Sequence, residues 1–358
     1  MRSFGVEEEL LLVAPDSGAP VALAGAVISQ DINNAPQSEL QQEQVETGTT
    51  PCTTLDELAD QLRARRRAAS KAAERRGAEV AALATSPLAV TPSTTHYDRY
   101  LEMVELYALT AQEQLTCGCH VHVSVTSEEE GVAVLDRIRP WLAPLLAMTA
   151  NSPFWQNGDT GYASYRHQVW GRWPSAGPTE LFGSPQTYHD LVQSMIESGG
   201  LLDEGMIYFD ARLSRRYPTV EIRVADVCLR TEDAVLLAAL VRALVETAAR
   251  AWRAGEPPEP ARIPLLRLAS WRASRSGLDG ELIHPLTDRP APADLVVHAL
   301  LDHLTPALTD AGDLDIATDL AGRLLSRGNG AALQRRVHRQ TGDLAAVVRA
   351  AVTCTLVS

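Results

Sequence analysis

The chain has 358 residues, of which 45% are hydrophobic, and it carries a formal net charge of -13. Nucleic acids and anionic membranes require a basic surface on the protein, so this charge argues against both partners and favours small-molecule ligands. No apolar run is long enough to span a membrane and no export signal opens the chain, so we expect one cytoplasmic domain over residues 1–358.

Three adjacent glutamates lie inside the first apolar run, residues 4–13. Side chains alternate along a strand, which places Glu7 and Glu9 on one face and Val6 and Leu10 on the other. Two carboxylates about 7 Å apart on a rigid strand suit a divalent cation. The alternative is a polar strand face at the edge of a sheet.

Two further acids, Glu39 and Glu46, lie in residues 39–49, a segment that we expect to be extended. Their spacing of seven puts them on opposite faces of a regular strand. A turn or bulge must therefore separate them if both serve one site.

A helix is expected over residues 55–76, with an arginine-rich stretch at 63–71 that is predicted to face solvent. It contains Lys71, the only lysine of the chain. Mechanisms that need a lysine nucleophile or a phosphate-loop lysine are therefore disfavoured, and any phosphate must be held by arginine and metal.

Residues 79–84 are expected to be extended and residues 97–115 helical, and residues 116–125 form an amphipathic strand. Alternation places His120 and His122 on its polar face, whereas Cys117 and Cys119 fall on the valine side. Structural zinc usually takes cysteines two to four residues apart, so we expect no zinc here. The alternative for the histidines is hydrogen bonding without chemistry. The five cysteines of the chain are expected to be free thiols.

The chain is predicted to be helical over residues 128–150, with kinks at Pro140 and Pro144. Residues 151–185 are rich in glycine, proline and aromatic side chains, which indicates a lid or a cleft wall. Two strands are expected near residues 206–210 and 219–226. Helices follow from residue 231, with breaks at 255–260 and 277–292.

The last of these strands places Glu221 and Arg223 on one face, and four arginines lie within twelve residues of the chain here. A guanidinium donates two parallel hydrogen bonds to a carboxylate or a phosphate. Acids and arginines on one sheet face describe a site for a metal-bound anion, the alternative being a surface ion-pair ladder. The pattern of elements predicts the α+β class, with the strands in one sheet whose polar face is a cleft.

Six short motifs, in order along the chain, resemble those of the glutamate cysteine ligase superfamily, specifically the bacterial type 2 group of carboxylate-amine ligases. The motifs are Phe4-Gly5-Val6-Glu7-Glu8-Glu9, Val45-Glu46 with Thr50-Pro51, Gly118-Cys119-His120-Val121-His122-Val123, Asp159-Thr160-Gly161-Tyr162, Thr219-Val220-Glu221-Ile222-Arg223-Val224 and Trp271-Arg272.

The resemblance implies a single domain with an antiparallel sheet shaped as a funnel and flanked by helices, related to glutamine synthetase. It implies that ATP phosphorylates a substrate carboxylate and that an amine attacks the acyl phosphate, with glutamate and cysteine as the candidate pair. The implied Mg²⁺ ligands are Glu7, Glu9, Glu39, Glu46 and Glu221. The implied nucleotide-binding residues are Glu7, Glu9, His120, His122 and Arg272. The implied clamp for the acyl phosphate or the substrate carboxylate is Arg223 with Arg212 and Arg166.

A metal-dependent hydrolase that uses the same acids and histidines to activate water is the alternative enzyme class. The sequence leaves the oligomeric state open, including a homo-oligomer. Replacement of Glu46 or Glu221 by glutamine is predicted to keep the fold, because it relieves repulsion between like charges on the polar face.

Overall fold

The computed structural model describes residues 1–28 and 36–357, and an antiparallel sheet of seven strands forms its centre. Six strands lie in the order β2-β3-β1-β5-β9-β8, and β4 pairs with the end of β1. The strands are β1 (Phe4–Val13), β2 (Gln37–Ser38), β3 (Gln44–Gly48), β4 (Glu79–Ala81), β5 (Gly118–Ser124), β8 (Ala211–Leu213) and β9 (Thr219–Asp226). About half of the elements in the described part of the chain are helices, and they flank this sheet. The predicted α+β class is therefore confirmed.

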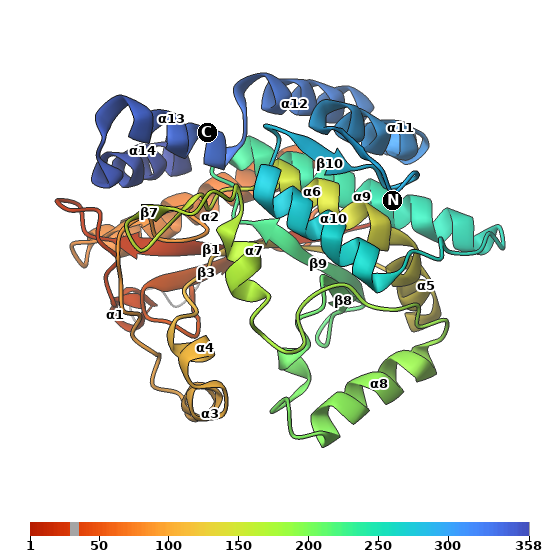
Figure 1. Ribbon diagram of the computed structural model, residues 1–358, viewed down its shortest axis with the longest axis horizontal. Coiled ribbons are helices and arrows are strands. Elements are labelled where there is room, and N and C mark those ends of the chain that lie inside the picture. The colour runs from red at the N-terminus through yellow and green to blue at the C-terminus, as the bar shows by residue number, and fades with distance from the viewer. Residues whose placement is uncertain (29–35, 358) are drawn as a thin grey trace.

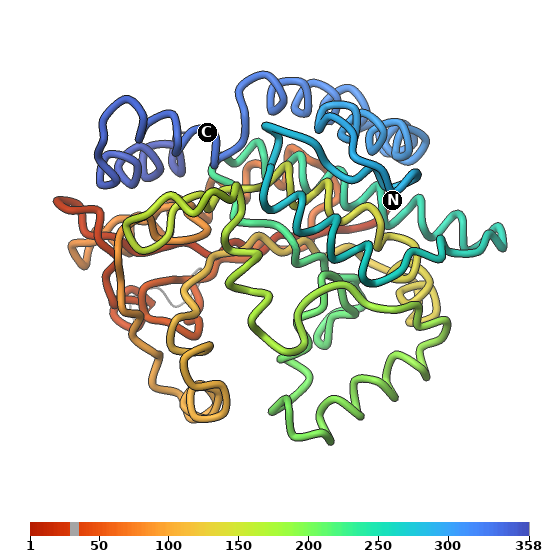
Figure 2. Tube along the Cα trace, viewed as in Figure 1, coloured from red at the N-terminus to blue at the C-terminus, as the bar shows by residue number. Residues whose placement is uncertain are grey.

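Helices lie on both sides of the sheet (Figure 1). A thick layer covers one face, and Figure 2 shows the last segments of the chain running over the outside of that layer. The layer consists of α2 (Leu55–Glu74), α5 (Glu128–Ile138), η1 (Arg139–Trp141), α6 (Leu142–Thr149), α9 (Thr231–Arg253), α10 (Ile263–Ser276), α11 (Ala293–Ala311), α12 (Leu314–Arg327), α13 (Gly330–Thr341) and α14 (Leu344–Val357). Among the described residues, none of the helices combines the length and apolar character needed to cross a membrane.

Shorter elements lie on the opposite, polar side of the sheet (Figure 1). They are α1 (Ala24–Ile28), α3 (Asp98–Tyr107), α4 (Leu109–Gln112), α7 (Tyr165–Trp170), α8 (Pro185–Glu197) and η2 (Glu204–Met206). Two small hairpins complete the structure, formed by β6 (Phe154–Trp155) with β7 (Gly158–Asp159) and by β10 (Glu281–Ile283) with β11 (Pro290–Pro292).

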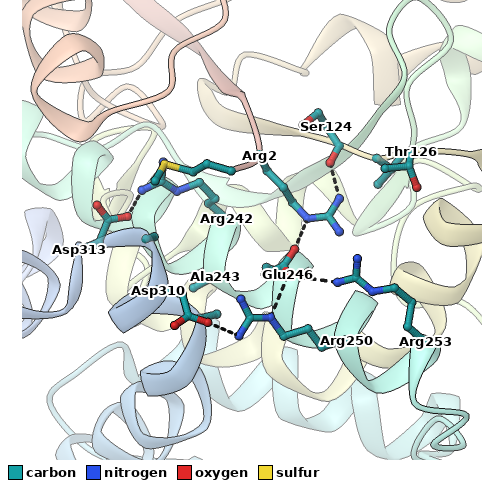
Figure 3. A pocket seen from close by; sticks show the side chains of 14 residues that line it. Arg2, Ser124, Thr126, Arg242, Ala243, Glu246, Arg250, Arg253, Asp310 and Asp313 are labelled. Atoms are coloured by element: carbon teal, nitrogen blue, oxygen red, sulfur yellow. Dashed lines mark hydrogen bonds and ion pairs between the residues drawn. The ribbon is translucent and has the colours of Figure 1, made fainter.

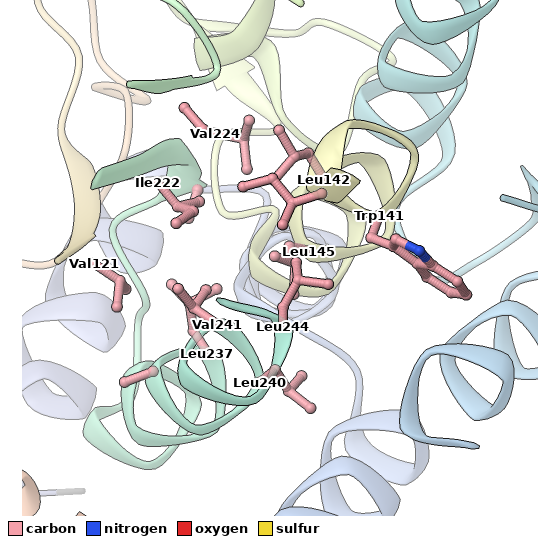
Figure 4. Close-up of a cluster of buried hydrophobic side chains, with 14 of the residues drawn as sticks. Val121, Trp141, Leu142, Leu145, Ile222, Val224, Leu237, Leu240, Val241 and Leu244 are labelled. Atoms are coloured by element: carbon pink, nitrogen blue, oxygen red, sulfur yellow. The ribbon is translucent and has the colours of Figure 1, made fainter. Parts of the chain in front are cut away.

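The main core lies between the sheet and α9, which is the longest helix (Figure 4). Alternate side chains of β5 and β9, including Val121 and Ile222, are fully buried against apolar side chains of α9 such as Leu240 and Val241. Truncating one such side chain to alanine costs about 2–5 kcal/mol. This packing makes the sheet a rigid support for the side chains on its other face.

The predicted element boundaries are partly wrong, for local reasons. The helix expected over residues 97–115 breaks at Ala108, whose φ of 48° is left-handed. The helix expected over residues 128–150 is interrupted by η1, where Pro140 lacks a backbone N–H. The strand expected at 206–210 begins only at Ala211. The loop expected at 151–185 contains α7 and the β6–β7 hairpin.

The prediction that the arginine-rich stretch of α2 faces solvent is wrong at one position. Arg66 is buried, with 1% of its surface exposed. It pairs with Glu8, the middle glutamate of β1, through contacts of 2.6 and 2.9 Å. Arg66 also donates to the carbonyl oxygens of Cys228 and Leu229 at 2.6 and 3.1 Å. The middle glutamate of the opening motif, Glu8, therefore belongs to the core side of the sheet.

Candidate active site

A cavity of about 590 Å³ lies over the polar face of the sheet. It brings together most of the acids and both histidines that the sequence singles out. The predicted residues that line it are Glu7, Glu9, Glu39, Glu46, His120, His122, Arg212, Glu221 and Arg223.

Strand register explains how these side chains meet. Glu9 is paired with Glu46 of β3, and Glu7 is paired with His120 of β5. His122 is in turn paired with Glu221 of β9. Neighbouring residues on adjacent strands share a face, so the site forms a continuous polar row across β3, β1, β5 and β9. Glu39 joins this row from the turn between β2 and β3, as its spacing from Glu46 requires.

Three overlapping groups of side chains in this row could each hold a metal ion. In each group the ligand atoms lie within 4.8 Å of one another. The groups are Glu7 with Glu46 and His120, Glu7 with His122 and Glu221, and Glu9 with Glu39 and Glu46. Carboxylate oxygens dominate, which fits Mg²⁺. Cys117 and Cys119 belong to none of these groups and are buried among apolar side chains.

Buried acids in the row have raised pKa values. Burial, together with the charge of Glu9, raises the pKa of Glu39 to about 7. Burial, followed by repulsion from Glu39, holds the pKa of Glu46 well above its ordinary value. Burial and the positive charge of Arg223 lower the pKa of His120, which keeps its imidazole neutral and able to ligate a metal. A bound cation would offset the cost of ionising these acids.

The arginines on this face differ in how many of their donors are already used. Arg212 donates to both carboxylate oxygens of Glu221 at 2.8 and 3.2 Å and to the carbonyl of Ile207 at 2.8 Å. Arg223 also donates to Glu221, but its buried Nε has no hydrogen-bond partner among the described residues. Arg223 is therefore better placed than Arg212 to bind a substrate anion.

Glu221 is flanked by these two arginines. Burial opposes ionisation of Glu221, but Arg223 and then Arg212 outweigh it and hold its pKa far below its ordinary value. The prediction that removing Glu221 relieves like-charge repulsion is therefore wrong, whereas the same argument holds for Glu46.

We expect glutamine substitutions at these two acids to shift thermal stability in opposite directions in metal-free protein. The raised pKa of Glu46 means that its ionisation destabilises the fold as the pH rises above the ordinary value of 4.5, so Glu46→Gln should be more stable than the parent at pH 8. Glu221 has a lowered pKa, so its charge stabilises the fold above that pH and Glu221→Gln should be less stable.

Melting curves in a chelator at pH 8 and pH 4 check both directions. We expect Tm shifts of about 2–5 °C of opposite sign at pH 8. At pH 4 the shift of Glu46→Gln should shrink, because that acid is then protonated in both states, whereas the shift of Glu221→Gln should largely persist, because pH 4 is still above its lowered pKa. Shifts of the same sign would contradict the assigned charges.

Two of the predicted residues do not line this cavity. Arg166, on α7, is 1% exposed and does not line the cavity, although it lies next to Gly118 at the start of β5. Arg272 lies on α10 in the outer layer, where its guanidinium is 5.7 Å from the ring of Trp271. The predicted nucleotide-binding role of Arg272 stays a prediction.

An aromatic wall faces the acids, and only part of it was predicted. Trp170 and Trp173 come from the expected lid segment. Tyr100 of α3 and Tyr208 also line the cavity, and neither stands in a periodic pattern or a recognised motif. Their spacing along the chain is irregular because each comes from a different loop or short helix at the rim.

A second cavity, of about 490 Å³, lies on the helical side of the molecule (Figure 3). Its arginines are already paired with carboxylates. Glu246 accepts from Arg2, Arg250 and Arg253, while Asp313 contacts Arg242. This network ties the amino-terminal segment to α9 and α11 and has no acid row comparable to the first cavity.

The fold is that of solved glutamate–cysteine ligases. A glutamate–cysteine ligase from Francisella tularensis in complex with AMP matches with a TM-score of 0.70 at 14% identity, covering 100% of this chain and 89% of that chain. A bifunctional glutathione synthetase from Pasteurella multocida also has a TM-score of 0.70, at 16% identity, covering 99% of this chain and 52% of that chain.

Fold and sequence together define a carboxylate–amine ligase of the glutamate–cysteine ligase type. The family model described as glutamate-cysteine ligase family 2 matches residues 3–350, and the chain belongs to this family. A Streptomyces avermitilis protein named "Putative glutamate--cysteine ligase 2-1" is 57% identical over 96% of each chain. A similarly named Streptomyces coelicolor protein is 54% identical over 99% of each chain. The resemblance read from the motifs is thus confirmed.

Proposed function

We propose that this enzyme joins the carboxylate of one small molecule to the amine of another, using ATP and Mg²⁺, through an acyl-phosphate intermediate. The observation that carries the proposal is the row of three overlapping metal-ligand groups beside a buried arginine with an unpaired donor. This combination favours phosphoryl transfer, because metal ions and guanidinium groups stabilise the negative charge that spreads over the transferred phosphoryl group.

The donor set fits magnesium, which Glu7, Glu9, Glu39, Glu46 and Glu221 would hold together with phosphate oxygens. Bound magnesium would neutralise the charge of the transferred phosphoryl group. Arg223 would bind the phosphoryl or carboxylate oxygens through its free edge, and Arg212 would orient Glu221. His120, neutral at pH 7, would add a nitrogen ligand.

Glutamate and cysteine are the proposed substrates, because the relatives and the solved neighbour carry the name glutamate–cysteine ligase. The aromatic wall and the rim arginines, including Arg99 and Arg215, offer contacts for an amino acid with both charged and apolar parts. We propose that the enzyme acts in the cytoplasm, where ATP is available.

A panel of carboxylic acids and amines, scored for ADP release, tests the reaction. We expect Mg²⁺-dependent ADP release only when acid and amine are both present, with one amide formed per ADP and its mass measured directly. Phosphate or amide hydrolysis without an amine and without ATP would instead favour the metal-dependent hydrolase.

A further inference from the structure

Trp170, the last residue of α7, contacts two arginines that come from different elements. The guanidinium carbon of Arg166, one helical turn earlier, lies 5.4 Å from the centre of the Trp170 ring. The guanidinium carbon of Arg223, on β9, lies 5.6 Å from the same ring. Both distances are within the range of cation–π attraction, for which tryptophan is the strongest side chain.

Both guanidinium groups are buried and retain an unused donor. Arg166 is 1% exposed and Arg223 is 8% exposed. Within residues 1–28 and 36–357, the Nε of each has no hydrogen-bond partner. A buried charged donor without a partner is costly. The face of an aromatic ring offsets part of that cost without occupying an N–H group, so the donors stay available for an anion.

A glycine at the start of β5 leaves room for the Arg166 side chain. A side chain at Gly118 would collide with Nη2 of Arg166, and its Cβ would lie 3.0 Å from Nε2 of His120. That Nε2 is also buried and without a hydrogen-bond partner among the described residues. Gly118 therefore lets the guanidinium of Arg166 lie close to the imidazole of His120, which lines the cavity.

The helix that carries Trp170 is capped at its start, and the Trp170 ring packs against Tyr208 at its end. At the start of α7, Ser164 accepts a hydrogen bond from the backbone of His167 and donates to the buried carboxylate of Asp226 at 2.8 Å. At the end of α7, the rings of Trp170 and Tyr208 are 4.7 Å apart in an edge-on arrangement. The indole therefore packs against a neighbouring ring at the end of a helix whose start is capped.

We propose that Trp170 is a positioning residue, which holds the guanidinium groups of Arg166 and Arg223 so that their charge and free donors converge on a phosphoryl oxyanion. Its part in catalysis rests on the proposed function, but the binding of an oxyanion does not. Phosphate binding without turnover therefore tests the inference separately.

The probe is inorganic phosphate, with its affinity measured by titration calorimetry at fixed ionic strength. We expect affinity to fall about threefold in Trp170→Phe, which keeps a weaker ring, and about tenfold or more in Trp170→Leu, which keeps only the apolar bulk. Trp155→Leu is the matched control, because Trp155 is half-buried outside the cavity and contacts Tyr165, and its phosphate affinity should equal that of the parent.

A double-variant cycle sharpens the test. The losses caused by Trp170→Leu and Arg223→Lys should not add, because both disturb one contact. Parental phosphate affinity in Trp170→Leu would overturn the proposal, as would additive losses or a parent protein that binds no phosphate. If Trp170→Leu fails to fold, the phosphate affinities of the parent, Trp170→Tyr and Trp170→Phe decide, and we expect them to fall in that order. Normal phosphate binding without any ADP release would contradict the proposed function and leave this inference standing.

Discussion

Arg223→Lys is expected to lower kcat/KM by about a hundredfold or more although it conserves charge. Arg223 contacts Glu221 and the ring of Trp170, and among the described residues its Nε has no hydrogen-bond partner. The ammonium group of lysine is compact, so it cannot pair with the Glu221 carboxylate, lie against the Trp170 ring and bind an oxyanion at the same time. Steady-state kinetics with each substrate saturating in turn measure the loss.

The pattern of that loss assigns the role of Arg223. A raised KM for the acid substrate with little change for ATP indicates a clamp on the substrate carboxylate, whereas a lowered kcat at nearly constant KM indicates a phosphoryl clamp. Arg250→Lys is the control, because Arg250 pairs with Glu246 and Asp310 on the far side of the molecule. Parental kinetics in Arg223→Lys would place this residue outside the reaction.

The largest expected effect on stability is that of Arg66→Met, which should lower the free energy of unfolding by about 3–5 kcal/mol. The substitution leaves the carboxylate of Glu8 fully buried without its cation. It also removes the donor that serves the carbonyl oxygens of Cys228 and Leu229. Urea unfolding monitored by circular dichroism measures the change.

A double variant separates the lost charge pair from lost packing. Arg66→Met combined with Glu8→Leu leaves no buried charge, so it should recover part of the stability that the single variant loses. Arg63→Met is the control on the same helix, because Arg63 makes only an exposed pair with Asp60 and should change stability little. A double variant no more stable than Arg66→Met would show that the buried charge is not the cause.

Much of the acid row could be predicted because it lies on long strands with clear alternation. His120 and His122 face the cavity and the intervening Val121 faces the core, as a two-residue period requires. Glu221 and Arg223 follow the same rule on β9. Antiparallel pairing of these strands then brings residues that are distant in the sequence next to one another, as it does for His122 and Glu221.

Features that depend on three-dimensional partners could not be predicted. The helical pattern of α2 does not distinguish Arg66 from its exposed neighbours, since its partner is a strand far away in the chain. Likewise, the pairing of Arg212 with Glu221 changes the charge environment of that acid, but no local spacing reveals it. Arg272 shows the opposite limit, because a motif can be recognised without indicating which layer of the fold carries it.

The candidate metal ligands and the aromatic wall are built on different kinds of structure. Strands that are also part of the hydrophobic core carry nearly all the acids, whereas α3, α7 and the loops around Tyr208 carry the rings. Loop residues tolerate substitution and insertion far better than core strands. We therefore expect relatives with the same fold to differ at the rings while the acids stay unchanged, so that the choice of acid and amine is set at the rim and not on the sheet.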